Sequence, residues 1–260
     1  MHLTKFGPLE FDTIAVAGGD GTLNAVVRAV LKNNIKAKIG VIPAGTSNDF
    51  ARHLKIGKSF IGAAHVIANG NTIEADVGQA NDMYFINVFG AGLITNIPHH
   101  VDPNLKQTLG PFAYYLKGLE KLQNYKPMPV RIITDNHVIE EDIYFFLALN
   151  SSQVAGLNNV IRGASVKDGF FDILAVKACG IGDVMALLLK FFQGEHINDE
   201  RVIHLLTSHV LIEPQNHEDK FETNIDGENG PTLPVEIKMH HNAIEFFAKV
   251  DSEGEIENGF

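Results

Sequence analysis

The chain has 260 residues, of which 45% are hydrophobic, and a net charge of −10 with histidine counted as neutral. That length can bury a sizeable core and predicts two domains, or one domain with a large insertion. The acidic balance argues against a general nucleic-acid-binding protein. No apolar run approaches the roughly 20 residues that a membrane-spanning helix needs, and no signal peptide is recognisable. The single cysteine, Cys179, excludes an intrachain disulfide and fits a cytoplasmic location.

The charge is distributed unevenly along the chain. The first 60 residues contain eight Lys or Arg against four Asp or Glu, whereas the remainder contains 13 against 27. A basic face beside an acidic body could approach anionic phosphates or an anionic membrane. An ordinary solvated surface explains the same distribution equally well.

The N-terminal third alternates between strand and helix patterns. Apolar runs at 13–17 and 38–42 indicate buried parallel strands, and each ends in a loop rich in small residues. Helical spacing of apolar residues follows at 23–31, and a second helix is expected at 47–54, with Ser47 or Asn48 as its N-cap. This order predicts a doubly wound α/β domain with ligands beyond the carboxyl ends of its strands.

After about residue 69 the pattern becomes mostly β. Helices are expected at 113–122 and 181–192, and the tail at 236–249 alternates enough to supply closing strands. The other segments indicate strands separated by turns, which predicts a second domain of β-sandwich type; they are 72–77, 83–89, 130–134, 144–150, 171–176 and 209–212.

The first chemical motif is Gly18-Gly19-Asp20-Gly21-Thr22, between a strand and a helix. Glycines allow a tight turn and a close approach to a ligand, and the N-terminus of the following helix offers N–H groups to phosphate oxygens. A carboxylate beside bound phosphate requires a cation such as Mg²⁺ between them. The alternative is a plain tight turn in which Asp20 favours a left-handed conformation.

The second motif, Pro43 to Arg52, repeats this arrangement after the next strand. Gly45, Thr46, Asn48 and Asp49 stand in or just after the loop, and Arg52 lies one helical turn further on. Asp49 could instead cap the helix and pair with Arg52. That reading suits each residue singly but explains poorly why two such loops follow consecutive strands.

Two Asp-Gly pairs occur later in the chain. A hairpin turn accounts for Asp226-Gly227 but does not require a carboxylate at position 228. Glu228 is therefore a candidate functional carboxylate. The turn at Asp168-Gly169 before a strand is expected to be structural. The histidine pairs at 99–100 and 240–241 show no metal-ligand context and are expected at the surface.

In this order the motifs resemble the diacylglycerol kinase catalytic-domain family, in particular the small soluble bacterial diacylglycerol and lipid kinases. The matching segments are Gly18–Thr22, Pro43–Arg52, Asn87–Gly92, Asp168–Asp172 and Asp226–Glu228. The first is shared with NAD kinases and resembles a phosphofructokinase loop, whereas the second separates the lipid kinases from both. The resemblance covers residue 11 to the end.

The resemblance implies an N-terminal nucleotide-binding α/β domain of the NAD kinase and phosphofructokinase type, formed by 1–79 and 246–260. Residues 80–245 would form the β-rich lipid domain. It also implies ATP and Mg²⁺ as cofactors, a diacylglycerol-like lipid at the membrane surface as substrate, peripheral membrane association and a homodimer.

The resemblance further implies roles for single residues. Gly18–Thr22, Gly45, Thr46, Asn48, Asp49 and Arg52 would bind the nucleotide. Metal would be held by Asp20, Asp49 and Asp76 at the active site and by Asp168 at a structural site. Glu228, with Asp226, would act as the general base, and Asp20 would contribute to catalysis.

The sequence departs from the family pattern in two places. Ala25 stands where the family usually has Glu, and only 17 residues precede Gly18, without the upstream N-P-x-x-G phosphate loop. We therefore expect an α/β domain that lacks its usual first part. Two alternatives stay open: a kinase for NAD or another soluble metabolite, and a nucleotide- or lipid-binding protein without turnover.

Overall fold

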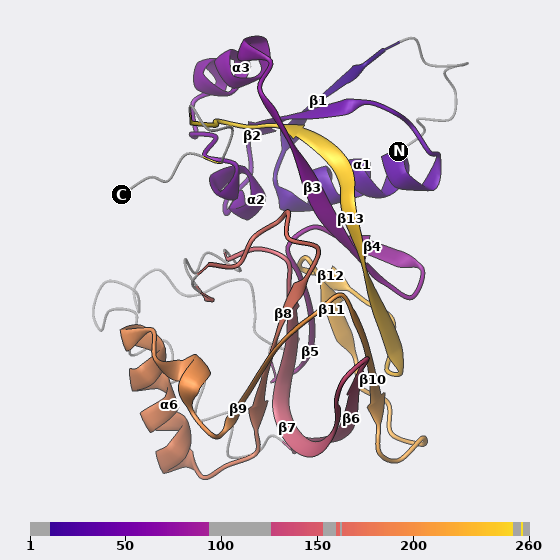
Figure 1. Ribbon diagram of the computed structural model, residues 1–260, viewed down its shortest axis with the longest axis vertical. Helices are drawn as coiled ribbons and strands as arrows, with labels where there is room; N and C mark the ends of the chain where they lie inside the picture. Colours follow the sequence, from indigo (N-terminus) through magenta and orange to yellow (C-terminus); the bar gives the residue numbers. More distant parts are fainter. Residues whose placement is uncertain (1–10, 94–125, 153–159, 162, 252–255, 257–260) are drawn as a thin grey trace.

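The computed structural model describes residues 11–93, 126–152, 160–161, 163–251 and 256. It contains a smaller unit of strands and helices and a larger unit built mostly of strands (Figure 1). The helix expected at 113–122 lies outside the described residues.

The smaller unit is organised by two parallel strands. Strand β1 (Thr13–Gly18) pairs with β2 (Lys38–Pro43) from Thr13 opposite Lys38 to Gly18 opposite Pro43. Helix α1 (Asp20–Lys32) connects them and buries its apolar side chains toward the sheet. Because both strands end at the same edge, the loops that follow them meet there.

Two further helices complete this unit. Helix α2 (Asp49–His53) is shorter than the 47–54 predicted, and α3 (Phe60–Asn69) was not predicted. In Figure 1, α3 lies above the strands and α1 and α2 lie below them, which is the expected doubly wound arrangement.

Two long strands connect the units. Strand β3 (Thr72–Ala80) runs antiparallel to β13 (Val235–Phe247), with a register shift between His240 and Ile244. The end of β13 joins β2 in parallel, and its beginning pairs with β10. Two large clusters of buried hydrophobic residues lie on either side of this crossing.

The larger unit is the predicted β-rich one. Its strands follow the order β13-β10-β6-β7-β5-β11-β12, β8 and β9 extend from β7, and β4 pairs with β3. Their bounds are β4 (Met83–Phe85), β5 (Val88–Gly92), β6 (Met128–Thr134), β7 (Val138–Leu149), β8 (Phe171–Lys177), β9 (Val202–Thr207), β10 (His209–Pro214), β11 (Thr223–Ile225) and β12 (Glu228–Asn229). The strand expected at 83–89 is broken at Ile86-Asn87, and β9 was not predicted.

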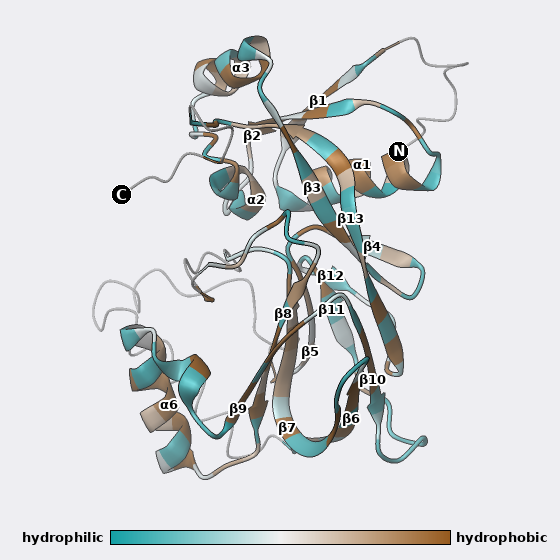
Figure 2. Ribbon diagram, viewed as in Figure 1, coloured by the Kyte–Doolittle hydropathy of each residue, from teal (hydrophilic) through white to brown (hydrophobic). Residues whose placement is uncertain are grey.

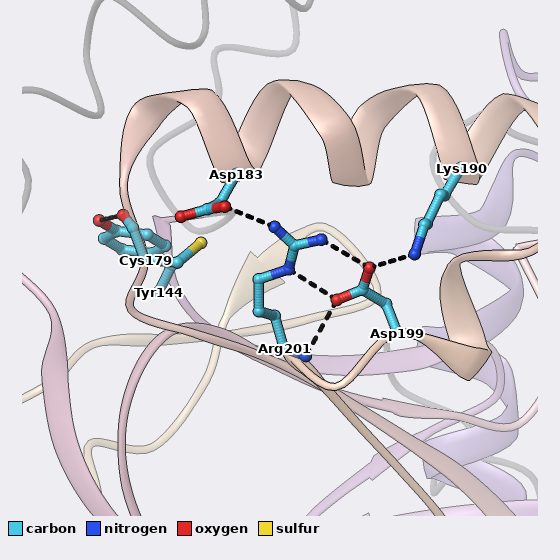
Figure 3. Close-up of polar contacts among 6 residues, drawn as sticks. All are labelled: Tyr144, Cys179, Asp183, Lys190, Asp199 and Arg201. Carbon is cyan, nitrogen blue, oxygen red and sulfur yellow. Dashed lines mark hydrogen bonds and ion pairs between the residues drawn. The ribbon is translucent and has the colours of Figure 1, made fainter.

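Helix α6 (Ile181–Gln193) lies at one end of the larger unit, and hydrophobic and hydrophilic residues alternate along it (Figure 2). A buried carboxylate fixes it. Asp199, after the 3-10 helix η3 (His196–Asn198), accepts hydrogen bonds from Lys190 and Arg201 at 2.7 Å, and Arg201 also pairs with Asp183 (Figure 3). These partners hold the pKa of Asp199 well below its usual range.

Within the described residues, no helix is both long and apolar enough to cross a bilayer.

Candidate active site

The first glycine loop is compact because its glycines face other parts of the chain closely. A Cβ at Gly18 would lie 2.5 Å from the Cβ of Thr22, so a larger residue there would displace that side chain. Asp20 is the first residue of α1 instead of a loop residue. The exposed Gly21 and Thr22 therefore lie in the first helical turn, where backbone N–H groups have no partner within the helix.

The two glycine loops are in direct contact. The N–H of Ala44 donates to the Gly18 carbonyl at 2.9 Å. A Cβ at Gly45 would lie 2.5 Å from Gly19 Cα, which is backbone and cannot rotate away. The loops predicted from separate motifs thus form one surface, and glycine at both positions permits it.

We expect Gly45→Ala to push the loops apart. For the ATP-dependent activity that the resemblance implies, this should lower kcat/KM for ATP about a hundredfold, the loss that follows a displacement of about 1 Å at a reacting group. Steady-state kinetics against ATP measures it. Gly57→Ala is the matched control, since a Cβ there meets nothing within 4 Å. Equal kinetics for both variants would contradict the role of this contact.

Asp20, at the start of α1, supplies the N-terminal cap of α2. Its two carboxylate oxygens accept the N–H groups of Asp49 and Phe50, at 3.0 and 3.1 Å, at the start of α2. Asn48 is the N-cap by position, with a left-handed φ of 51°, but its side chain bonds Gly45 instead. The cap expected from Ser47 or Asn48 is therefore supplied by Asp20.

The second loop also presents polar side chains. Thr46 and Ser47 are exposed at its tip, whereas Asp49 is buried and forms an ion pair with Arg52 one turn further on. The pairing of Asp49 with Arg52 was the open alternative in the sequence. The ion pair fixes the Arg52 guanidinium one turn beyond the exposed hydroxyls of Thr46 and Ser47, and hydroxyl and guanidinium groups are donors suited to phosphate oxygens.

Glu228 reaches this surface from the larger unit. Arg28 of α1 donates to its Oε2 at 2.8 Å and also to the Tyr84 carbonyl at 2.8 Å. The other oxygen, Oε1, lies 3.8 Å from where a Cβ on Gly21 would stand. The glycine loop and Glu228, some 200 residues apart in the chain, are therefore neighbours, and Arg28 connects their units.

Asp226 holds the turn that presents Glu228. Positive φ at Asp226 and Gly227 fits the predicted hairpin turn, and the carboxylate accepts the N–H groups of Ile86, Asn87 and Val88 at 2.8 to 3.0 Å. Burial raises the pKa of Asp226 to about 6, against those three donors, which favour the carboxylate. A carboxylate with these partners positions Glu228 and is poorly placed to receive a proton itself.

Asp76 is fully buried where β3 and β13 cross between the units. Its carboxylate accepts hydrogen bonds from the backbone of Gly169 and Asn242 and from His241 Nδ1, at 2.7 to 2.8 Å. N–H donors occupy both oxygens of Asp76, and the carboxylate fixes the bulge in β13. The contribution to a magnesium site that the resemblance implies for Asp76 would be made through the water molecules around the ion.

Asp168 lies near Asp76, in the turn before β8. Its Oδ1 accepts the N–H of Phe170 at 3.0 Å. Burial raises the pKa of Asp168, and the neighbouring carboxylates of Asp76 and Asp172 raise it further. Such mutual repulsion is what a bound cation would relieve.

The part of the chain that the structure describes contains no group of three or more His, Cys, Asp or Glu side chains able to hold a metal alone. Asp20, Asp49 and Asp76 are thus not gathered into one cluster. Both oxygens of Asp20 accept backbone N–H groups and Asp49 is paired with Arg52, so these two carboxylates would organise a magnesium largely through the water and phosphate oxygens that complete its shell.

Comparison with known proteins gives two consecutive matches. The diacylglycerol kinase catalytic domain matches residues 3–80, and the YegS C-terminal NAD kinase beta sandwich-like domain matches residues 87–248. Diacylglycerol kinase from Bacillus subtilis is 38% identical over 91% of this chain and 78% of its own length. The chain belongs to the diacylglycerol kinase catalytic-domain family.

Other members of the diacylglycerol kinase family agree. Diacylglycerol kinase from Staphylococcus aureus is 35% identical over 93% of this chain and 76% of its own length. A crystal structure of a diacylglycerol kinase from Bacillus anthracis has a TM-score of 0.70 at 25% identity, over 92% of this chain and 76% of that one. The resemblance and the fold class predicted from the sequence are confirmed.

Sequence reasoning missed two contributors to the site. Arg28 appeared only as one of the basic residues of the first segment, although its helical spacing from Gly21 places both on one face of α1. His241 was expected at the surface, and its side chain is half exposed, yet its ring bonds the buried Asp76. Both partners lie more than 150 residues away, so no local pattern could reveal them.

Proposed function

We propose that this protein is an ATP-dependent lipid kinase that transfers the γ-phosphate of ATP to a lipid hydroxyl, with diacylglycerol as substrate and phosphatidic acid as product. Family membership implies the use of ATP. The single observation that favours catalysis is Glu228, whose free oxygen faces the first turn of α1 beside two touching glycine loops. An NAD kinase-like activity is not favoured, because the relatives are diacylglycerol kinases.

In this proposal the nucleotide phosphates lie against the joined glycine loops. Gly18, Gly19, Gly21 and Gly45 allow the backbone to approach, and the N-terminus of α1 favours negative charge there. Thr22, Thr46 and Asn48 complete the loops, and Arg52 supplies a positive charge near the transferred group. These contacts align donor and acceptor and stabilise charge, which is most of the catalysis in phosphoryl transfer.

Glu228 is the proposed general base. The lipid hydroxyl gives its proton to Oε1 as its oxygen bonds to the γ-phosphorus and the bond to the β-phosphate oxygen breaks, which releases ADP. Arg28 keeps Oε2 in place, so the base cannot turn away from the first turn of α1. Asp226 contributes by holding the hairpin turn, not by exchanging protons.

Magnesium, when bound with ATP, would neutralise phosphate charge and favour loss of the leaving group. Asp20 and Asp49 are the residues that would hold it. Asp20 also orients α2, so it would link metal binding to the shape of the second loop. A second, structural cation is proposed beside Asp168, the residue to which the resemblance assigns it.

The remaining features are proposals that follow from the family. The nucleotide unit would comprise 1–79 and 246–260 and the lipid unit 80–245, close to the boundary of the two family matches. The protein would work as a homodimer, without nucleic acid, and contact the membrane only peripherally from the cytoplasm.

The test is transfer of labelled γ-phosphate from Mg-ATP to a panel of diacylglycerol, monoacylglycerol, ceramide, sphingosine and phosphatidylglycerol in mixed micelles. Diacylglycerol should be the best acceptor. No labelled lipid with any acceptor would contradict the proposal, as would labelled NAD formed equally well without lipid.

A further inference from the structure

Helix α3 leaves most of its surface open to solvent. It buries only Ala63 in full, and it contains no charged residue along Phe60–Asn69. Phe60 and Ile61, next to each other in its first turn, are 62% and 72% exposed. Ile61 is the most exposed large hydrophobic residue in the described part of the chain, and water-exposed pairs of this kind typically mark a contact with another surface.

Other contacts hold α3 in place, so the packing of this helix does not depend on Phe60 and Ile61. Ser59 caps α3 by accepting the N–H of Gly62, so the helix start is fixed by hydrogen bonding. Two turns after Phe60, Ile67 packs so closely on β2 that a Cβ at Gly40 would be 2.5 Å from its Cδ1. Ala63 and Ile67 therefore anchor α3, while Phe60, Ile61 and Ala64 are exposed.

The surroundings of this pair are basic in an acidic protein. From residue 50 to residue 73 the chain has no Asp or Glu, although it has 31 in total. Arg52 is engaged with Asp49, but Lys55 and Lys58 immediately precede α3, and Lys58 is exposed. Two adjacent hydrophobic side chains flanked by lysines complement a bilayer that offers both an apolar interior and anionic headgroups.

We propose that Lys55, Lys58, Phe60, Ile61 and Ala64 form a membrane-docking surface that binds bilayers containing anionic lipid. Phe60 and Ile61 enter the headgroup region, and the two lysines pair with headgroup phosphates. The purpose of this surface, which is to bring the enzyme to its lipid substrate, rests on the proposed function. Membrane binding itself needs neither ATP nor turnover.

The test is co-sedimentation of the full chain with vesicles of phosphatidylcholine, with and without phosphatidylglycerol. Wild type should bind the anionic vesicles and bind the neutral ones much more weakly. Phe60→Ser with Ile61→Ser should reduce the bound partition coefficient by at least about tenfold, as expected for two lost apolar insertions. Lys58→Gln should reduce it about fivefold, the effect of one basic residue at an anionic surface.

Matched controls alter equally exposed residues elsewhere. Val138→Ser changes a hydrophobic residue that is 61% exposed on β7, and Lys36→Gln removes an exposed lysine before β2; both should bind like wild type. Unchanged vesicle binding by the Phe60 and Ile61 variant would contradict the proposed docking surface. So would a shift of that variant from dimer to monomer with vesicle binding intact, since a second copy would then cover the patch.

A second readout separates this surface from the proposed function. Phosphorylation of a short-chain, monomeric diacylglycerol should be unchanged in the Phe60 and Ile61 variant, whereas phosphorylation of diacylglycerol in anionic vesicles should fall. Vesicle binding without phosphorylation of any lipid would contradict the kinase proposal and leave the docking surface standing. Equal losses on both substrates would overturn the docking surface alone.

Discussion

Glu228→Gln is expected to lower kcat for lipid phosphorylation about a thousandfold, within the range that general base catalysis contributes. The amide keeps the size of the side chain and can still contact Arg28, but it cannot accept the proton of the lipid hydroxyl. KM for ATP should change little, because Glu228 is proposed to contact the acceptor. Initial rates at saturating ATP and lipid measure the effect.

The matched control is Glu222→Gln, which alters an exposed carboxylate just before β11. Thermal unfolding should be similar for both variants and wild type, since Glu228 is itself about half exposed and makes one ion pair. If the two variants retained equal kcat, Glu228 would not be the base.

Asp76→Ala is expected to lower the free energy of unfolding by about 3 kcal/mol, the usual cost of leaving buried hydrogen-bonding groups unpaired. The substitution leaves the N–H groups of Gly169 and Asn242 without an acceptor and removes the hydrogen-bond partner of His241. All three residues lie where the two units cross. The midpoint of urea unfolding, compared at constant slope, measures this loss.

Asp82→Ala provides the comparison, because Asp82 is exposed in the turn between β3 and β4. It should unfold within about 0.5 kcal/mol of wild type, as surface substitutions usually do. A small effect at Asp76 combined with complete loss of metal-dependent activity would contradict the structural role and support the ligand role that the resemblance implied.

Much of the fold could be predicted because its signals are local. Apolar runs followed by glycine loops gave β1 and β2 almost to the residue, and helical spacing gave α1 and α6. Helix α3 was missed because its exposed apolar face hides the amphipathic period on which such a prediction depends. The strand expected at 83–89 broke because Asp226, distant in sequence, takes up the backbone N–H groups of Ile86 and Asn87.

The site could be predicted as a set of residues but not as a set of contacts. Two glycine loops after consecutive strands had to meet, and they do. That Asp20 would cap α2, or that Arg28 would hold Glu228, depends on how distant elements pack, which composition and spacing do not encode. Asp76 shows the same limit, because the groups that bond its carboxylate, on Gly169, His241 and Asn242, lie more than 90 residues away in the chain.

The most direct test of the proposed function measures ADP and phosphorylated lipid together in one reaction with Mg-ATP and diacylglycerol. We expect equal amounts of ADP and phosphatidic acid from wild type, and both should fall in parallel in Glu228→Gln. ADP formed without lipid phosphate, at a rate that Glu228→Gln leaves unchanged, would show that these loops bind and cleave ATP without transferring its phosphate to a lipid.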